Sequence, residues 1–363
     1  MRDFWRNNVV PKLLYFSKLI FAIVCALVAG SILLLCLGYS PIEVYGVMIN
    51  KAITSFDVVL RRATILTLAG LAVAIPNKAG VLNMGGEGQI IMGALVAAVV
   101  GGMDLGLPAG IHAAVAVLSA AVVGIVLAFL PASLSLYRGA SESVVGIMMN
   151  RIIALCATWL ATNPFKGSIH SPKTADVLET AQIADVGSFS FSWAYFITIA
   201  LCILGWFLLE RTNKGLSMKA AGLNPTAASF QGINVKTMGI IGMLIGGAMA
   251  GVGGSFEILG GVNYYMDNYF TGFGYDGVAI AIMAGNNPIG VIFSGLFMAV
   301  IRIGSLGLSR KVGLTTYYIN VLQGFLIAFL VVPYLAEMTF GGVGNAWKWL
   351  KGKLSKKKDG DRA

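Results

Sequence analysis

The chain has 363 residues, of which 57% are hydrophobic and 12% are charged, whereas soluble globular domains carry about 25% charged residues. The apolar residues form nearly uncharged blocks of about twenty, the length that a helix needs to cross a bilayer. These properties exclude a soluble globular protein, and a transmembrane β-barrel would alternate over about ten residues instead. The sequence therefore predicts an all-α, polytopic membrane protein.

The net charge of +10 is concentrated beside apolar blocks, at residues 2–18 and 348–358. Juxtamembrane Lys and Arg mark cytoplasmic segments and attract anionic lipid headgroups. Because no domain remains to bind nucleic acid, no nucleic-acid partner is expected. The four cysteines fall within apolar blocks without paired spacing and only two histidines occur, so neither a metal site nor a catalytic cluster is predicted.

About ten transmembrane helices are expected, with both termini in the cytoplasm: 19–38, 59–76, 86–101, 109–130, 144–162, 192–209, 237–254, 275–286, 289–306 and 317–336. They leave a cytoplasmic N-terminal segment at 1–18, a transmembrane domain at 19–336 and a basic cytoplasmic tail at 337–363. The block 275–286 is too short to cross alone. Loop 210–236 falls inside and loop 163–191 outside, while Arg310 and Lys311 fall outside, against the positive-inside rule. Glycine-rich polar segments at 83–89 and 251–261 suggest an inverted five-helix repeat.

The segment NMGGEGQ, Asn83 to Gln89, lies between two apolar blocks. An ionisable side chain in a membrane costs several kcal/mol unless it faces protein or water, so Glu87 is not expected to face lipid. The glycines predict a broken start to the third span, because glycine is a poor helix former. Two compatible interpretations stay open. The segment lines a pathway, or Asn83 caps the helix while Glu87 complements its dipole.

The longest hydrophilic stretch on the expected cytoplasmic side is 210–236. Asn213 is placed to cap a short helix that stops at Gly222. Asn224 is placed to start another, with Pro225 at the first helical position, where its missing N–H is harmless, and Gly232 ends it. Two short helices joined by a tight turn are therefore predicted. Such a pair can receive force from a soluble partner, and the alternative is a plain amphipathic connector.

The stretch GYDGVAIAIMAGNNPIG, residues 274–290, ends in an Asn-Pro turn signal. In the seventh span, the spacing of Gly242, Gly246, Gly247 and Gly251 favours close helix packing. Neither a GxxxxGK[ST] phosphate-binding loop nor a GxSxG or HExxH pattern occurs. The chain is therefore expected to be no enzyme, to have no catalytic residues and to bind no cofactor of its own.

Three segments in order, VLNMGGEGQIIMGA, GLSMKAAGLNPTAASFQGI and GYDGVAIAIMAGNNPIG, resemble the permease subunits of bacterial ATP-binding-cassette (ABC) importers. The branch is the one shared by branched-chain amino acid and simple-sugar permeases. Within it the chain looks most like the permeases of nucleoside importers, over about residues 60–335. It has Met84 where that family more often has Ile.

The resemblance implies a multi-pass protein of the bacterial inner membrane that translocates nucleosides or related sugars. The implied partners are a cytoplasmic ABC ATPase subunit that uses the ATP, a second and different permease chain, and a substrate-binding lipoprotein outside. The implied ATPase-coupling residues are Lys219, Ala220, Ala221, Gly222, Asn224, Pro225, Ala227, Ala228 and Gly232. The expected substrate-pathway residues are Asn83, Glu87, Gln89, Glu142, Asn150 and Asn263, whose amides and carboxylates can bind hydroxyls or base edges.

Two alternatives remain open at this point. The chain could be an ion-coupled secondary transporter with Glu87 as the proton or cation site. It could also be an ABC permease for simple sugars or branched-chain amino acids, since these permeases share much of the pattern.

Overall fold

The computed structural model describes residues 24, 27–168, 171–187, 191–308, 321, 324–325 and 328. It divides into two compact units, Met1–Gly46 with Leu308–Ala363, and Val47–Gly307. In the first unit, the described residues include the apolar helix Leu27–Cys36, whose Leu27 carbonyl accepts a hydrogen bond of 2.9 Å from the Tyr45 hydroxyl. The second unit contains all the features described below.

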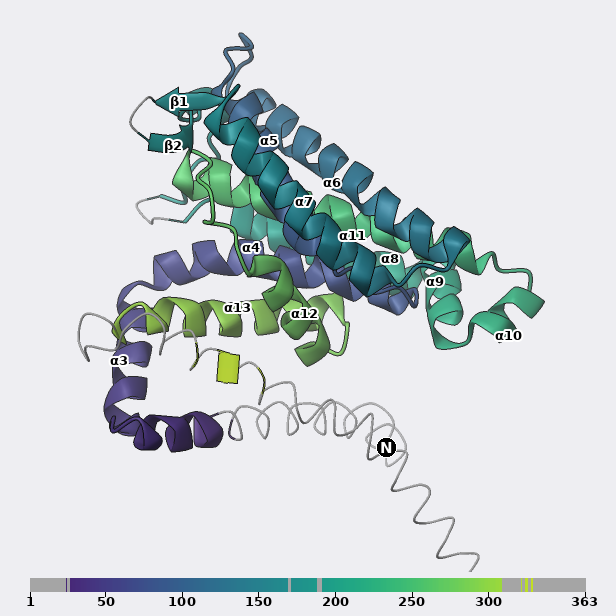
Figure 1. The fold of residues 1–363 in the computed structure, drawn as a ribbon, viewed down its shortest axis with the longest axis horizontal. Helices are drawn as coiled ribbons and strands as arrows, with labels where there is room; N and C mark the ends of the chain where they lie inside the picture. The colour runs from purple at the N-terminus through teal and green to yellow at the C-terminus, as the bar shows by residue number, and fades with distance from the viewer. Residues whose placement is uncertain are drawn as a thin grey trace, which may run out of the picture. The chain divides into compact units, whose positions relative to one another are not determined.

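The second unit is helical with one small hairpin (Figure 1). Its elements in chain order are α3 (Pro41–Thr54, which begins in the first unit), α4 (Phe56–Lys78), α5 (Gly86–Gly102), α6 (Ile111–Arg138), α7 (Glu142–Thr162), β1 (Lys166–Ser168), β2 (Ser171–Thr174), η2 (Glu179–Ala181), α8 (Ala194–Arg211), α9 (Asn213–Leu223), α10 (Pro225–Phe230), α11 (Val235–Glu257), η3 (Ile258–Val262), α12 (Phe273–Met283) and α13 (Pro288–Ser305).

Among the described residues, six helices are long and apolar enough to cross a membrane, namely α4, α6, α7, α8, α11 with η3, and α13. The helices α5 and α12 are shorter and apolar. Each span predicted between residues 59 and 306 thus coincides with a helix, which confirms a polytopic helical membrane protein. The span predicted at 317–336 lies mostly outside the described residues, so the number of ten stays a prediction. Helix α3 was not predicted.

Helix α11 packs against α4, α5 and α6 through its glycines. A side chain at Gly247 would overlap the backbone of Gly124, and one at Gly251 would overlap the backbone of Ala120. The backbones of α6 and α11 therefore touch directly, as small residues allow in membrane proteins. This confirms the close packing predicted from the glycine spacing.

The segment between α7 and α8 folds onto the C-terminal end of α11. Strands β1 and β2 form an antiparallel hairpin, and the Thr174 backbone N–H donates to the Tyr265 carbonyl over 3.1 Å. Farther along, the Ile183 N–H donates to the Leu259 carbonyl over 2.8 Å. The hairpin lies at one end of the unit and α9 and α10 lie at the other (Figure 1).

Candidate functional site

The predicted break at the start of the third span is present between α4 and α5. The N-cap residue of α5 is Gly85, which offers no side-chain cap, so the interpretation of Asn83 as the cap is wrong. The Asn83 amide instead pairs with the Gln89 amide, with donor–acceptor distances of 2.9 and 3.2 Å, and donates to the Ala72 carbonyl. The physical reason is burial, because two buried amides can satisfy each other's donor and acceptor.

Glu87 lies in the first turn of α5 and is 5% exposed. Its Oε1 accepts a hydrogen bond from the Gly272 N–H over 2.6 Å, and its Oε2 accepts one from the Gly274 N–H over 3.0 Å. These N–H groups belong to the start of α12, where a helix leaves donors without intrahelical partners. Glu87 therefore complements the positive end of α12 in addition to lying near that of α5.

Helix α7 supports the break from the other side. The Glu142 carboxylate accepts from the Leu82 N–H over 2.7 Å. The Asn150 side chain accepts from the Gly88 N–H over 2.9 Å and donates to the Met84 carbonyl over 2.8 Å. Five of the six expected pathway residues thus gather around one backbone break, and each is engaged by protein groups. The sixth, Asn263, lies at the far end of α11.

A second polar cluster, which the sequence analysis missed, connects α4, α11, α12 and α13. The Arg62 guanidinium lies 3.2 Å from the Glu257 carboxylate, which also accepts a hydrogen bond of 2.7 Å from the Tyr269 hydroxyl. Burial and the neighbouring carboxylate raise the pKa of Tyr269 to about 12, so this hydroxyl stays protonated. The signal for this cluster was available, because charges inside apolar blocks need partners.

Phe273 extends this cluster toward α13. Its ring centroid lies 5.1 Å from the Arg62 guanidinium and 4.3 Å from that of Arg302, within the range of cation–π attraction. Arg302 in turn approaches the Asp276 carboxylate at 2.8 Å. The first turn of α12 is therefore fixed by Glu87 on one side and by two arginines on the other.

The helix pair predicted in 210–236 is confirmed. Asn224 caps α10, its side chain accepting from the Ala227 N–H over 3.0 Å, and Pro225 takes the first helical position. The predicted Asn213 cap of α9 is wrong by one residue. Thr212 is the cap, because α8 ends at Arg211 and leaves the Thr212 hydroxyl free to accept from the Gly215 N–H.

One side of this pair faces the transmembrane helices. Ala221 and Ala228 are buried, and a side chain at Gly222 would overlap the Lys78 carbonyl at the end of α4. Lys219 forms an ion pair with Glu210 at 2.8 Å. Two large apolar side chains point away instead, since Leu223 is 87% exposed and Phe230 is 88% exposed.

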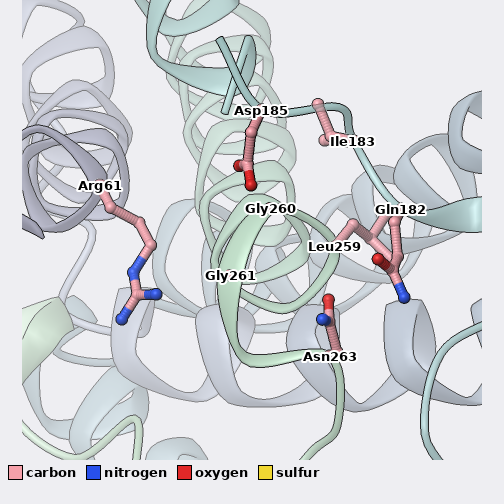
Figure 2. A pocket seen from close by; sticks show the side chains of 8 residues that line it. All are labelled: Arg61, Gln182, Ile183, Asp185, Leu259, Gly260, Gly261 and Asn263. Carbon is pink, nitrogen blue, oxygen red and sulfur yellow. The ribbon is translucent and has the colours of Figure 1, made fainter. Parts of the chain in front are cut away.

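A small polar cavity lies at the opposite end of the unit, beside the segment between α7 and α8. Its volume is about 140 Å³, and Figure 2 shows its lining: Arg61, Gln182, Ile183, Asp185, Leu259, Gly260, Gly261 and Asn263. Asn263, an expected pathway residue, is thus the one of the six that lines this cavity. Within the described residues, no group of three or more His, Cys, Asp or Glu side chains is placed to hold a metal ion.

Comparison with known proteins agrees with this arrangement. Residues 55–331 match the family described as branched-chain amino acid transport system / permease component. The chain is 30% identical to the guanosine ABC transporter permease protein NupP of Bacillus subtilis, covering 92% of this chain and 98% of NupP. It is 29% identical to the nucleoside ABC transporter permease protein NupB of Lactococcus lactis, covering 98% and 100%.

The chain is also 28% identical to the glucose ABC transporter permease protein TsgB13 of Haloferax volcanii, covering 93% of this chain and 94% of TsgB13. No solved structure matches it significantly. The family match spans the α4–α5 break, the α9–α10 pair and α12 together. The chain therefore belongs to the permease components of the branched-chain amino acid transport family.

Proposed function

We propose that this chain is the membrane-spanning permease subunit of an ATP-driven ABC importer of the bacterial inner membrane, and that it translocates nucleosides or related sugars. An ABC ATPase subunit supplies the energy from the cytoplasm, and a lipid-anchored binding protein delivers substrate from outside. The substrate class follows the names of the relatives, two of which are guanosine or nucleoside permeases and one a glucose permease.

The observation that carries the proposal is the α9–α10 pair. It is held against the end of α4 through Gly222, and it presents Leu223 and Phe230 almost fully exposed. Large apolar side chains at a surface favour a protein contact, and buried aromatic anchors often dominate such contacts. A soluble ATPase that covers these two side chains would gain a rigid attachment to the membrane helices.

A second, different permease chain is the expected partner within the membrane. Bacillus subtilis has two relatives of this chain, NupP and NupQ, both named guanosine ABC transporter permease proteins. Lactococcus lactis likewise has NupB and NupC, both named nucleoside ABC transporter permease proteins. These pairs support a heterodimeric transmembrane part for the importer proposed here.

The ion-coupled alternative would use Glu87 as its ion site. Both oxygens of that carboxylate accept backbone hydrogen bonds from the start of α12, which favours a positioning role for Glu87. A discriminating experiment measures guanosine uptake into proteoliposomes. The proposal expects uptake only with the ATPase, the partner permease and ATP present. Uptake by this chain alone, driven by an ion gradient, would overturn it.

The coupling surface is tested separately with the double variant Leu223→Ala/Phe230→Ala. We expect it to insert normally but to lose copurification of the ATPase and ATP-dependent uptake. The matched control is Leu204→Ala/Phe207→Ala, which removes the same two kinds of side chain from exposed positions on α8 and should retain both. Normal ATPase association by the first variant would contradict the assignment.

A further inference from the structure

The small cavity is built by three separate parts of the chain. Arg61 extends from α4, Gln182 and Asp185 come from the segment before α8, and Asn263 follows η3 at the end of α11 (Figure 2). The cavity is far from α9 and α10, because Arg61 lies near the start of α4 whereas Lys78, which contacts α9, ends it. In the proposed importer this is the external end.

The polar groups in the cavity have unused hydrogen-bonding capacity. Within the described part of the chain, the Arg61 guanidinium has no carboxylate within ion-pair distance, although Asp185 lines the same cavity. The Asn263 side-chain amide likewise makes no hydrogen bond there. The Gln182 amide donates to the Val177 carbonyl over 3.2 Å, which leaves its oxygen free to accept. The cavity therefore offers both donors and acceptors.

The backbone around Asn263 has an unusual conformation. Asn263 follows a π-helical turn, η3, and has a φ of 63°, in the left-handed region. Isolated π-turns and left-handed non-glycine residues are found preferentially at functional sites. The backbone of Asn263 is nevertheless fully paired, since its N–H donates to the Ile258 carbonyl and its carbonyl accepts from the Val177 N–H. The fixed main chain thus holds a free amide at the cavity.

We propose that this cavity is a subsite for the hydroxyl groups of a neutral sugar ring, occupied as substrate enters the importer. This inference rests on the proposed function. A volume of about 140 Å³ is below the roughly 300–1,000 Å³ of a pocket for a drug-sized ligand, so the cavity suits a sugar ring better than a whole nucleoside.

The charge balance selects against anions. Arg61 would attract a phosphate, but the Asp185 carboxylate in the same lining would repel it. Two amides, one guanidinium and one carboxylate instead match the paired donors and acceptors of neighbouring hydroxyls. The lining thus favours nucleosides over nucleotides.

The test variant is Asn263→Gly, which deletes the amide while glycine readily adopts the positive φ. The matched control is Asn268→Gly, because Asn268 also has a positive φ of 60° but does not line the cavity. A second variant, Arg61→Met, removes the guanidinium, which has no ion-pair partner in the described part of the chain. The complete importer is assayed for uptake of guanosine and of its 2′,3′-dideoxy counterpart at low concentration.

We expect wild type and Asn268→Gly to prefer guanosine. Asn263→Gly and Arg61→Met should each reduce that preference by about three- to tenfold, the effect of one lost hydrogen bond. If wild type takes up guanosine but neither folded variant changes the preference, the inference is wrong. Leucine uptake is measured in the same importer. If wild type takes up leucine and Arg61→Met loses that uptake, the cavity binds amino acid zwitterions and the inference is also wrong. Absence of nucleoside uptake by wild type would instead refute the proposed function.

Discussion

Replacing Glu87 by Gln tests whether this carboxylate holds the start of α12 in place. In the wild type both carboxylate oxygens accept backbone hydrogen bonds, from Gly272 and Gly274. Glutamine keeps one oxygen and turns an NH₂ group toward the other N–H, so one charge-assisted hydrogen bond is lost and a buried donor is left unpaired. Each of these changes costs about 1–3 kcal/mol, which gives a destabilisation of about 2–6 kcal/mol.

The measurement is the midpoint of thermal unfolding of the purified protein in detergent. With an unfolding entropy of about 2.1 cal/mol/K per residue, a change of 1 kcal/mol shifts the midpoint of this 363-residue chain by about 1.3 °C. A fall of about 3–8 °C is therefore expected. The control is Glu210→Gln, which neutralises a carboxylate in a partly exposed ion pair with Lys219. Such pairs contribute about 0–1 kcal/mol, and the midpoint should move little.

A different result would refute this reasoning. If Glu87→Gln unfolds at the wild-type temperature and transports with altered substrate preference, the carboxylate contacts the transported molecule. Its hydrogen bonds to α12 would then contribute little to stability. A lower midpoint with an unchanged preference among nucleosides supports the positioning role.

Two further predictions concern neighbouring positions. Gly88→Ala should lower the unfolding midpoint, because the new methyl group would collide with Asn150 and Ile153. The control is Gly86→Ala, whose methyl group meets open space and should be tolerated. Equal midpoints for the two variants would refute the packing argument. Arg302→Met should lower the midpoint because it removes the cation beside the partly buried Asp276 carboxylate. The loss should stay below the roughly 3–5 kcal/mol that breaking a fully buried ion pair costs. The double variant Arg302→Met/Asp276→Asn should recover part of that loss in the same assay, and no recovery would mean that the packing of Arg302 on Phe273 dominates.

Local signals were sufficient for much of the fold. Asn224 followed by Pro225 specifies a helix start through its own side chain and ring, and α10 begins there. The glycine spacing in α11 likewise predicted its close packing correctly. The cap of α9 was misplaced because Thr212 and Asn213 are both good caps, and the choice depends on where α8 ends.

The candidate site was predicted less completely, for a physical reason. The partners of Glu87 are 185 and 187 residues away in sequence, and no local pattern indicates which backbone groups will meet a buried carboxylate. The same holds for Arg62 and Glu257. Their charges within apolar blocks could have been recognised as needing partners, but not as partners of each other. The role of the expected pathway residues stays a prediction, although five of them support one break.

The contact at Gly222 has a mechanical consequence. This glycine lies directly against the Lys78 carbonyl and the backbone of Gly80, with no side chain between them to yield. A few residues farther on, Glu87 accepts two hydrogen bonds from the start of α12. A displacement of α9 would therefore be transmitted through the α4–α5 break to α12. In the importer proposed here, a movement of the ATPase against α9 would in this way reach α12 through direct contacts.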